Sequence, residues 1–200
     1  MYDQYHALIF DMDGTLLDTM SIHERAWREA LEAFSLPVIP SLMRKLVGMP
    51  TRKSLEIIAE QGGVIIDDLD EIVRDKEQRV HQQLHQVRPI DAIADIARHY
   101  HGRKPLAVGT GASLAEAQQL LQAAGIAHLF DTIVSADQVS HPKPAPDTFA
   151  LAAERLRVNP TQCVVFEDGE TGMIAARAAG MAVVDVRPLI GAAGHYFVTL

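Results

Sequence analysis

Two carboxylates with a single residue between them follow a short apolar run near the start of the chain. Residues 7–10 are all apolar, and Asp11-Met12-Asp13-Gly14-Thr15 comes next. A continuous rather than alternating apolar run is typical of a strand that is buried on both faces of a parallel sheet. Both acids would then lie at the carboxyl end of an interior strand, where ligands of open α/β sheets bind.

Two like charges are costly to bury at such a position. At a separation of about 4 Å they repel by roughly 4 kcal/mol with an effective dielectric near 20. We therefore expect either a cation beside Asp11 and Asp13 or a proton on one of them. On their own, these residues could also be a strand that ends in an ordinary turn, because Asp and Gly are common in turns.

Side chains that a site beside Asp11 and Asp13 would need recur at three later strand ends. They are Thr110, Lys143 and the pair Glu167-Asp168. Taken singly, the lysine is typical of a solvated surface, the threonine of a plain strand end, and the acid pair of a turn before a helix. The carboxyl ends of parallel strands meet at one edge of a sheet, so the set together favours a single site.

Strands that alternate with helices after residue 90 predict the sheet that holds these residues. We expect strands at 106–108, 132–134, 163–166 and 182–186, separated by helices that include 114–124, 147–156 and 171–179. This rhythm implies right-handed βαβ units. The predicted fold class is α/β, with a Rossmann-like parallel sheet core in three α/β/α layers and an inserted α-helical cap.

The inserted cap is predicted from a stretch without comparable strand signals. Ser21 and Glu24 are spaced as a capping box before a first helix, and further helices are expected at 42–47, at 52–61 with Thr51 as its cap, and at 68–84. About seventy residues are too many for a simple connection. We predict a core domain of residues 1–17 and 88–200 and a cap domain of residues 18–87.

Composition argues against two classes of partner, although it leaves room for a locally positive pocket that binds a small phosphate ester. The net charge of −8 disfavours nucleic acid and anionic membranes.

The single cysteine, Cys163, lies in an apolar run and cannot form a disulfide within the chain, which fits a reducing cytoplasm. We expect neither a signal peptide nor a membrane span. Nothing marks an oligomer interface, so the default expectation is a cytoplasmic monomer.

The motifs, in order and at matching spacing, resemble those of the haloacid dehalogenase superfamily. The resemblance spans about residues 6–187 and includes a glycine, Gly172, shortly after the last acid pair. The helical insertion is similar to the cap of the β-phosphoglucomutase-like group, which includes sugar phosphatases of the fructose-1-phosphatase type. The stretches VGTGAS, HPKPAPDTF, QCVVFEDG and AARAAGM resemble those phosphatases.

The resemblance implies a covalent phosphoryl-transfer mechanism. Asp11 would be the nucleophile that forms an aspartyl-phosphate, and the Asp13 side chain would act as general acid and base. Thr110, the backbone amide near Gly111, and Lys143 would bind the phosphate.

The resemblance also implies Mg²⁺ as the cofactor. Its ligands would be the side chains of Asp11 and Asp168 with the carbonyl of Asp13, while Glu167 would act directly or through water. Candidate substrate contacts from the cap are His23, Trp27, Thr51, Arg52 and Lys76, although Trp27 also fits the apolar face of its helix.

The type of reaction follows from further residues. An acid at Asp13 argues against the dehalogenase branch, where halide departure needs no acid, and against P-type ATPases, which carry threonine there. The β-phosphoglucomutases place a Lys-Asn pair after the second motif, but this chain has Gly111-Ala112-Ser113-Leu114, and its cap-loop arginine is displaced to Arg52. One missing cation would forfeit roughly 1.5 to 3 kcal/mol of charged hydrogen bonding.

We therefore favour a Mg²⁺-dependent phosphatase that hydrolyses a small phosphorylated sugar, with fructose 1-phosphate as the first guess. Hexose 6-phosphates and 2-deoxyglucose 6-phosphate are rival substrates. The alternative is a β-phosphoglucomutase-type isomerase that works through a sugar bisphosphate. A third interpretation is a non-catalytic phosphosugar-binding protein.

Overall fold

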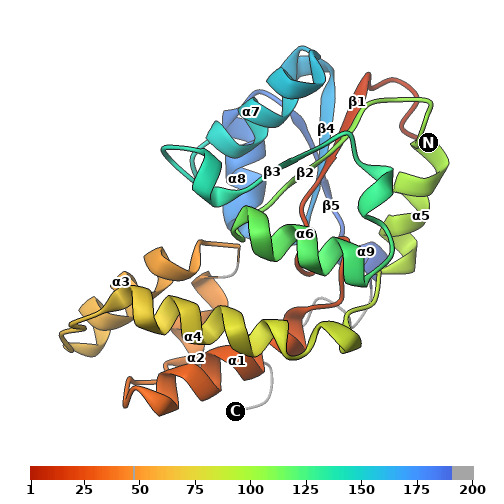
Figure 1. The fold of residues 1–200 in the computed structure, drawn as a ribbon. Coiled ribbons are helices and arrows are strands. Elements are labelled where there is room, and N and C mark those ends of the chain that lie inside the picture. The colour runs from red at the N-terminus through yellow and green to blue at the C-terminus, as the bar shows by residue number, and fades with distance from the viewer. Residues whose placement is uncertain (47, 191–200) are drawn as a thin grey trace.

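In the computed structural model, which describes residues 1–46 and 48–190, five parallel strands form one sheet beside a group of helices (Figure 1). The strands are β1 (Ala7–Phe10), β2 (Leu106–Gly109), β3 (Thr132–Val134), β4 (Cys163–Glu167) and β5 (Ala182–Asp185). Their order is β3-β2-β1-β4-β5, so β1 is central. The predicted α/β class with a parallel sheet is confirmed, and the strands lie within one residue of their predicted bounds.

The central strand is fully buried because helices cover both of its faces. Leu8 is in register with Leu106 of β2 and Val164 of β4. Leu8 and Phe10 belong to one hydrophobic cluster, whereas Ile9 belongs to the cluster on the opposite face. A strand in this position needs an apolar residue at every position, which explains the continuous run in the sequence.

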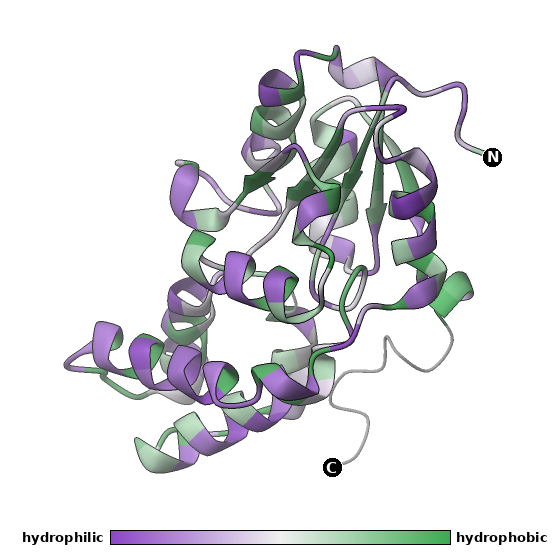
Figure 2. Cartoon of the chain, turned by 45° about the vertical axis from the view of Figure 1, so that its right-hand side comes forward, coloured by the Kyte–Doolittle hydropathy of each residue, from purple (hydrophilic) through white to green (hydrophobic). Residues whose placement is uncertain are grey.

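The helices of the core form the two outer layers. On the Leu8 face lie α5 (Asp91–Tyr100), α6 (Leu114–Ala123) and α9 (Arg187–Ile190), and on the other face lie α7 (Asp147–Leu156) and α8 (Glu170–Ala178). Figure 2 shows hydrophobic strands between helices that each carry both hydrophobic and hydrophilic residues. Short 3₁₀ turns occur at Leu84–Gln86, Ala127–Leu129, Ala136–Gln138 and Pro160–Gln162.

The inserted helices lie together next to the carboxyl edge of the sheet (Figure 1). They are α1 (Met20–Ala33), α2 (Pro40–Met43), the 3₁₀ turn Arg44–Leu46, α3 (Thr51–Gly62) and α4 (Leu69–His81). They have a hydrophobic cluster of their own, which includes Trp27, Leu31 and Leu55.

The two crossings between core and insertion lie side by side. The Asp18 N–H donates to the Arg88 carbonyl at 2.9 Å, and Leu17 bridges to Pro89. The division into a core of residues 1–17 and 88–200 and a cap of residues 18–87 stays a prediction, because Ile22, Ala26 and Val80 of the insertion belong to the same hydrophobic cluster as Leu8 and Phe10 of the central strand. Residues 191–200 of that core lie outside the described residues, as does Val47, the predicted end of the second cap helix.

Two predicted helix starts are wrong. Helix α1 begins at Met20 with Thr19 at the N-cap, so Ser21 and Glu24 lie inside the helix and cannot form the predicted capping box. Thr51 is the first residue of α3 rather than its cap, because Pro50 occupies the N-cap position. Helix α4 ends at His81 instead of residue 84. Among the described helices, none is long and apolar enough to span a membrane.

Candidate active site

Three carboxylates converge at the carboxyl ends of β1 and β4. Asp11 follows β1, and its N–H donates to the Phe166 carbonyl at 2.9 Å, which extends the pairing of the two strands. Glu167 is the last residue of β4, and Asp168 is the next. One oxygen from each of the three acids lies within 4.8 Å of the others, and all three side chains are buried. This donor set fits a single hard cation.

Lys143 provides a positive charge in this cluster. Its Nζ donates to Asp11 Oδ1 at 2.6 Å and to Glu167 Oε2 at 2.8 Å, and the residue is only 1% exposed. The ammonium also lies 4.6 Å from the ring centroid of Phe149, within the range of a cation–π interaction. Burial alone would lower the pKa of Lys143, but the two carboxylates outweigh it and raise the pKa, so the side chain stays charged.

Two of the three carboxylates, those of Asp11 and Asp168, have raised pKa values. Burial and the charge of Glu167 raise the pKa of Asp11 well above its ordinary value, and Lys143 offsets part of this rise. Burial and Glu167 also raise the pKa of Asp168 to about 7, although Thr15 Oγ1 donates to Asp168 Oδ1 at 2.7 Å and opposes the rise. One ammonium does not balance three carboxylates, and a divalent cation would supply the missing charge.

Two glycines leave the space that this cluster needs. A Cβ at Gly172 would lie 1.8 Å from Glu167 Oε2, so only glycine lets that carboxylate approach the start of α8. Gly14 has a φ of 82°, and a Cβ there would lie 2.6 Å from Asp168 Oδ2. Both positions therefore require glycine for the acids to meet.

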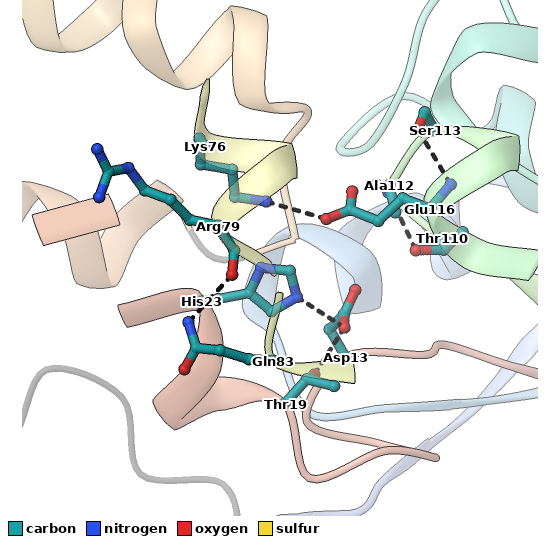
Figure 3. Close-up of polar contacts among 10 residues, drawn as sticks. All are labelled: Asp13, Thr19, His23, Lys76, Arg79, Gln83, Thr110, Ala112, Ser113 and Glu116. Carbon is teal, nitrogen blue, oxygen red and sulfur yellow. Dashed lines mark hydrogen bonds and ion pairs between the residues drawn. The ribbon is translucent and has the colours of Figure 1, made fainter. Parts of the chain in front are cut away.

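The Asp13 side chain has partners other than those of Asp11, and Figure 3 shows it beside Thr19 and His23. Its Oδ1 accepts a hydrogen bond from Thr19 Oγ1 at 2.6 Å and lies 3.0 Å from His23 Nε2. Burial would raise the pKa of Asp13, but His23 and Thr19 together lower it below the ordinary value. The motif thus places two acids one residue apart in environments that shift their pKa values in opposite directions, which is a pattern of paired catalytic acids.

A cavity between the cap and the carboxyl edge of the sheet brings most of the other predicted residues together. Trp27 belongs to the cap's hydrophobic cluster and also lines this cavity. The predicted lining residues are Asp11, Asp13, His23, Trp27, Thr51, Lys76, Thr110 and Gly111, and the others are Met20, Leu46, Gly48, Met49, Ala112 and Glu116.

One predicted substrate contact has other surroundings. Arg52 is not among the described residues that line the cavity, and its guanidinium pairs with Asp70 of α4. Thr110 does line the cavity, and its hydroxyl accepts a hydrogen bond from the Ala112 N–H at 3.1 Å. The cap loop lies directly against Gly111, since a Cβ there would be 2.3 Å from the Gly48 carbonyl oxygen. The cap is therefore closed over the core at this point.

Three residues at the site were not singled out from the sequence. Thr15 donates to Asp168 and Thr19 donates to Asp13. Thr15 belongs to the first motif and Thr19 lies four residues after it, and these positions were the available signal. Glu116 pairs with Lys76 of the cap. Ser113 and Glu116 have only the spacing of a capping box, and this spacing gives no indication of a partner forty residues away.

Comparison with known proteins agrees with this geometry. Residues 8–186 match the family model of haloacid dehalogenase-like hydrolases. The chain belongs to this family. Fructose-1-phosphate phosphatase YqaB of Escherichia coli (strain K12) is 48% identical to this hydrolase over 190 residues, which cover 94% of this chain and 100% of the relative.

More distant relatives of the hydrolase include an isomerase. The β-phosphoglucomutase of Bacillus subtilis (strain 168) is 31% identical over 195 residues, which cover 93% of this chain and 86% of the relative. The crystal structure of a hydrolase from Pseudomonas syringae superposes with a TM-score of 0.81 at 26% identity and covers 89% of this chain and 83% of that chain. The predicted superfamily and its β-phosphoglucomutase-like relatives are thus confirmed.

Proposed function

We propose that this haloacid dehalogenase-like hydrolase is a Mg²⁺-dependent phosphatase of small sugar monophosphates, with fructose 1-phosphate as its first candidate substrate. The observation that carries the proposal is the convergence of Asp11, Glu167 and Asp168 with Lys143 at the edge of a cavity that Asp13 also lines. The substrate is suggested by the 48% identity to a fructose-1-phosphate phosphatase.

The metal would be held by the side chains of Asp11 and Asp168 and by the carbonyl of Asp13, with Glu167 acting directly or through water. Bound Mg²⁺ would neutralise charge on the phosphoryl oxygens and on the attacking carboxylate. Lys143 adds a second positive charge beside Asp11, since its Nζ lies 2.6 Å from Asp11 Oδ1.

The reaction would proceed in two displacements. An Asp11 oxygen attacks the phosphorus, the ester bond to the sugar oxygen breaks, and Asp13 gives that oxygen a proton. Asp13 then takes a proton from the water that attacks the phosphoaspartate, which releases inorganic phosphate and restores Asp11. In the structure His23 and Thr19 lower the pKa of Asp13, and the negative charge of a bound substrate phosphate would act in the opposite direction.

A substrate panel tests the proposal. Purified protein with Mg²⁺ is assayed for phosphate release from fructose 1-phosphate, hexose 6-phosphates, 2-deoxyglucose 6-phosphate and β-glucose 1-phosphate. We expect turnover of fructose 1-phosphate that is lost in the Asp11→Asn variant and in chelator. Release of phosphate from no member of the panel would overturn the proposal. Near-normal turnover by Asp11→Asn would reject the covalent scheme.

Isomerisation of a sugar phosphate through a bisphosphate is the second candidate, because the B. subtilis β-phosphoglucomutase is 31% identical over most of the chain. Product analysis separates the two. Phosphate release from β-glucose 1-phosphate supports the hydrolase, and glucose 6-phosphate formation primed by a bisphosphate supports the mutase. A phosphosugar-binding protein without activity would bind members of the panel and turn none over.

We further propose that the protein acts as a monomer in the cytoplasm. Its single cysteine, Cys163, is buried in β4, where burial raises the pKa of the thiol to about 11 and keeps it unreactive. This environment agrees with a structural thiol in a reducing compartment.

A further inference from the structure

A buried ion pair joins the cap to the core at the candidate site. Lys76 Nζ on α4 donates to Glu116 Oε1 on α6 at 3.2 Å. Lys76 is 3% exposed and Glu116 is 7% exposed, so water contributes little to the solvation of either charge. Figure 3 shows the lysine pointing out of the cap helix toward the carboxylate on the core helix, near the group formed by Asp13, Thr19 and His23.

Both members of the pair line the cavity that also holds Asp11 and Asp13. Glu116 lies in the first turn of α6, where its N–H donates to the Ser113 hydroxyl at 3.3 Å and the helix dipole favours a negative charge. Its carboxylate therefore points into the cavity as a charged group whose backbone position the helix start fixes.

The Lys76–Glu116 pair adds one positive and one negative charge to the lining of the cavity. Of the described residues that line the cavity, Lys76 is the one lysine or arginine, and Glu116 balances it. Glu77 of α4 is half-buried nearby, and burial together with the charge of Glu116 raises its pKa. The surroundings of Lys76 thus hold at least as much negative as positive charge.

We propose that Glu116 is a specificity-determining residue that excludes substrates with a second anionic group. With Glu116 in place, a neutral sugar body can donate its hydroxyl protons to the carboxylate and accept from the ammonium. A second phosphate or a carboxylate would instead face Glu116, and the repulsion between like charges would weaken its binding. This inference rests on the proposed function, because it assumes that a sugar phosphate enters the cavity with its phosphate toward Asp11.

The simpler interpretation is that the pair only holds the cap closed. A closing contact would affect every substrate to the same extent, because its loss changes the position of the cap and not the charge that one substrate meets. A charge filter changes the ratio between substrates. The ratio of two kcat/KM values is therefore the decisive quantity.

The test compares fructose 1-phosphate with fructose 1,6-bisphosphate, the second measured as formation of fructose 6-phosphate. We expect the wild-type protein to prefer the monophosphate by at least about tenfold in kcat/KM. In Glu116→Gln, which keeps the shape and removes the charge, the ratio should shift toward the bisphosphate by about tenfold, because Lys76 is freed to pair with the second phosphate. The matched control is Glu154→Gln on the exposed face of α7, which should keep the wild-type ratio.

Equal changes for both substrates in Glu116→Gln, or a wild-type preference for the bisphosphate, would overturn the inference. If Glu116→Gln does not fold, calorimetric binding of the two sugars to Asp11→Asn with Mg²⁺ decides, and tighter binding of the bisphosphate contradicts the filter. If the wild type releases phosphate from none of the sugar phosphates, only the proposed function fails. The binding comparison still tests whether the cavity that contains Glu116 disfavours a second phosphate.

Discussion

Replacing Asp168 by asparagine should stabilise the metal-free protein at neutral pH. Asp168 is buried among other carboxylates, and burial and Glu167 raise its pKa to about 7. An asparagine keeps the shape of the side chain and can still accept the hydrogen bond from Thr15, which lies 2.7 Å from Asp168 Oδ1. The substitution therefore removes a costly charge and leaves its neighbours in place.

The size and the sign of the effect follow from proton linkage. The folded pKa of Asp168 is about 7 against an ordinary value of 3.8, a rise of about three units, which corresponds to about 4 kcal/mol. Because the folded value is the higher one, this stability is present below pH 4 and is lost as the pH rises through 7. Asparagine does not titrate, so its advantage over aspartate should grow from near zero at pH 4 to as much as about 4 kcal/mol at pH 8.

Urea denaturation of both proteins in chelator, from pH 4 to pH 9, measures this difference. Added Mg²⁺ should make the wild type the more stable protein at pH 8. The ion binds the folded wild type and stabilises it, whereas the variant lacks the Asp168 ligand. The matched control is Asp185→Asn on β5, where Arg187 holds the pKa of the carboxyl below its usual range and no such gain is expected. A stability difference that does not change with pH, or a less stable Asp168→Asn protein at pH 8 in chelator, would contradict the raised pKa of Asp168.

Three other substitutions test the site. Lys143→Met should destabilise the metal-free protein by about 3 to 5 kcal/mol at neutral pH, because it leaves buried carboxylates uncompensated, and a loss below about 1 kcal/mol in chemical denaturation would contradict this. Gly172→Ala should weaken Mg²⁺ binding in calorimetry by about tenfold or more, since the new Cβ displaces Glu167, and unchanged affinity would argue against that carboxylate as a ligand. His23→Asn should raise the pKa of Asp13, seen as a higher midpoint in a carboxyl-carbon NMR titration, and an unmoved midpoint would show that His23 does not set this pKa.

The sheet and the first motif could be predicted because their signals are local. A strand with both faces covered needs an unbroken apolar run, and Ala7–Phe10 has one. The polar residues after such runs are confined to one edge of the sheet by the parallel topology. This rule was enough to group Asp11 with Asp168, which lie more than 150 positions apart in the sequence.

The cap was less predictable because several of its side chains bind to residues that are distant in the sequence. Thr19 occupies the N-cap position of α1, yet its hydroxyl donates to Asp13 instead of accepting a hydrogen bond from the helix, and the local Ser21 pattern misplaced the helix start. The pairing of Lys76 with Glu116 depends on how the cap is placed against the core, which no spacing along the chain encodes. Sequence patterns therefore identified the candidate catalytic residues of the core more fully than the contacts of the cap.

The most direct test of the account is to trap the phosphoenzyme. The protein is mixed with Mg²⁺ and fructose 1-phosphate labelled in its phosphate, quenched with acid within one turnover, digested and mapped. We expect the label on the peptide that contains Asp11, and none in the Asp11→Asn variant treated in the same way. Turnover without a labelled peptide, or a label on another residue, would contradict a mechanism in which the carboxylate after β1 attacks the phosphate.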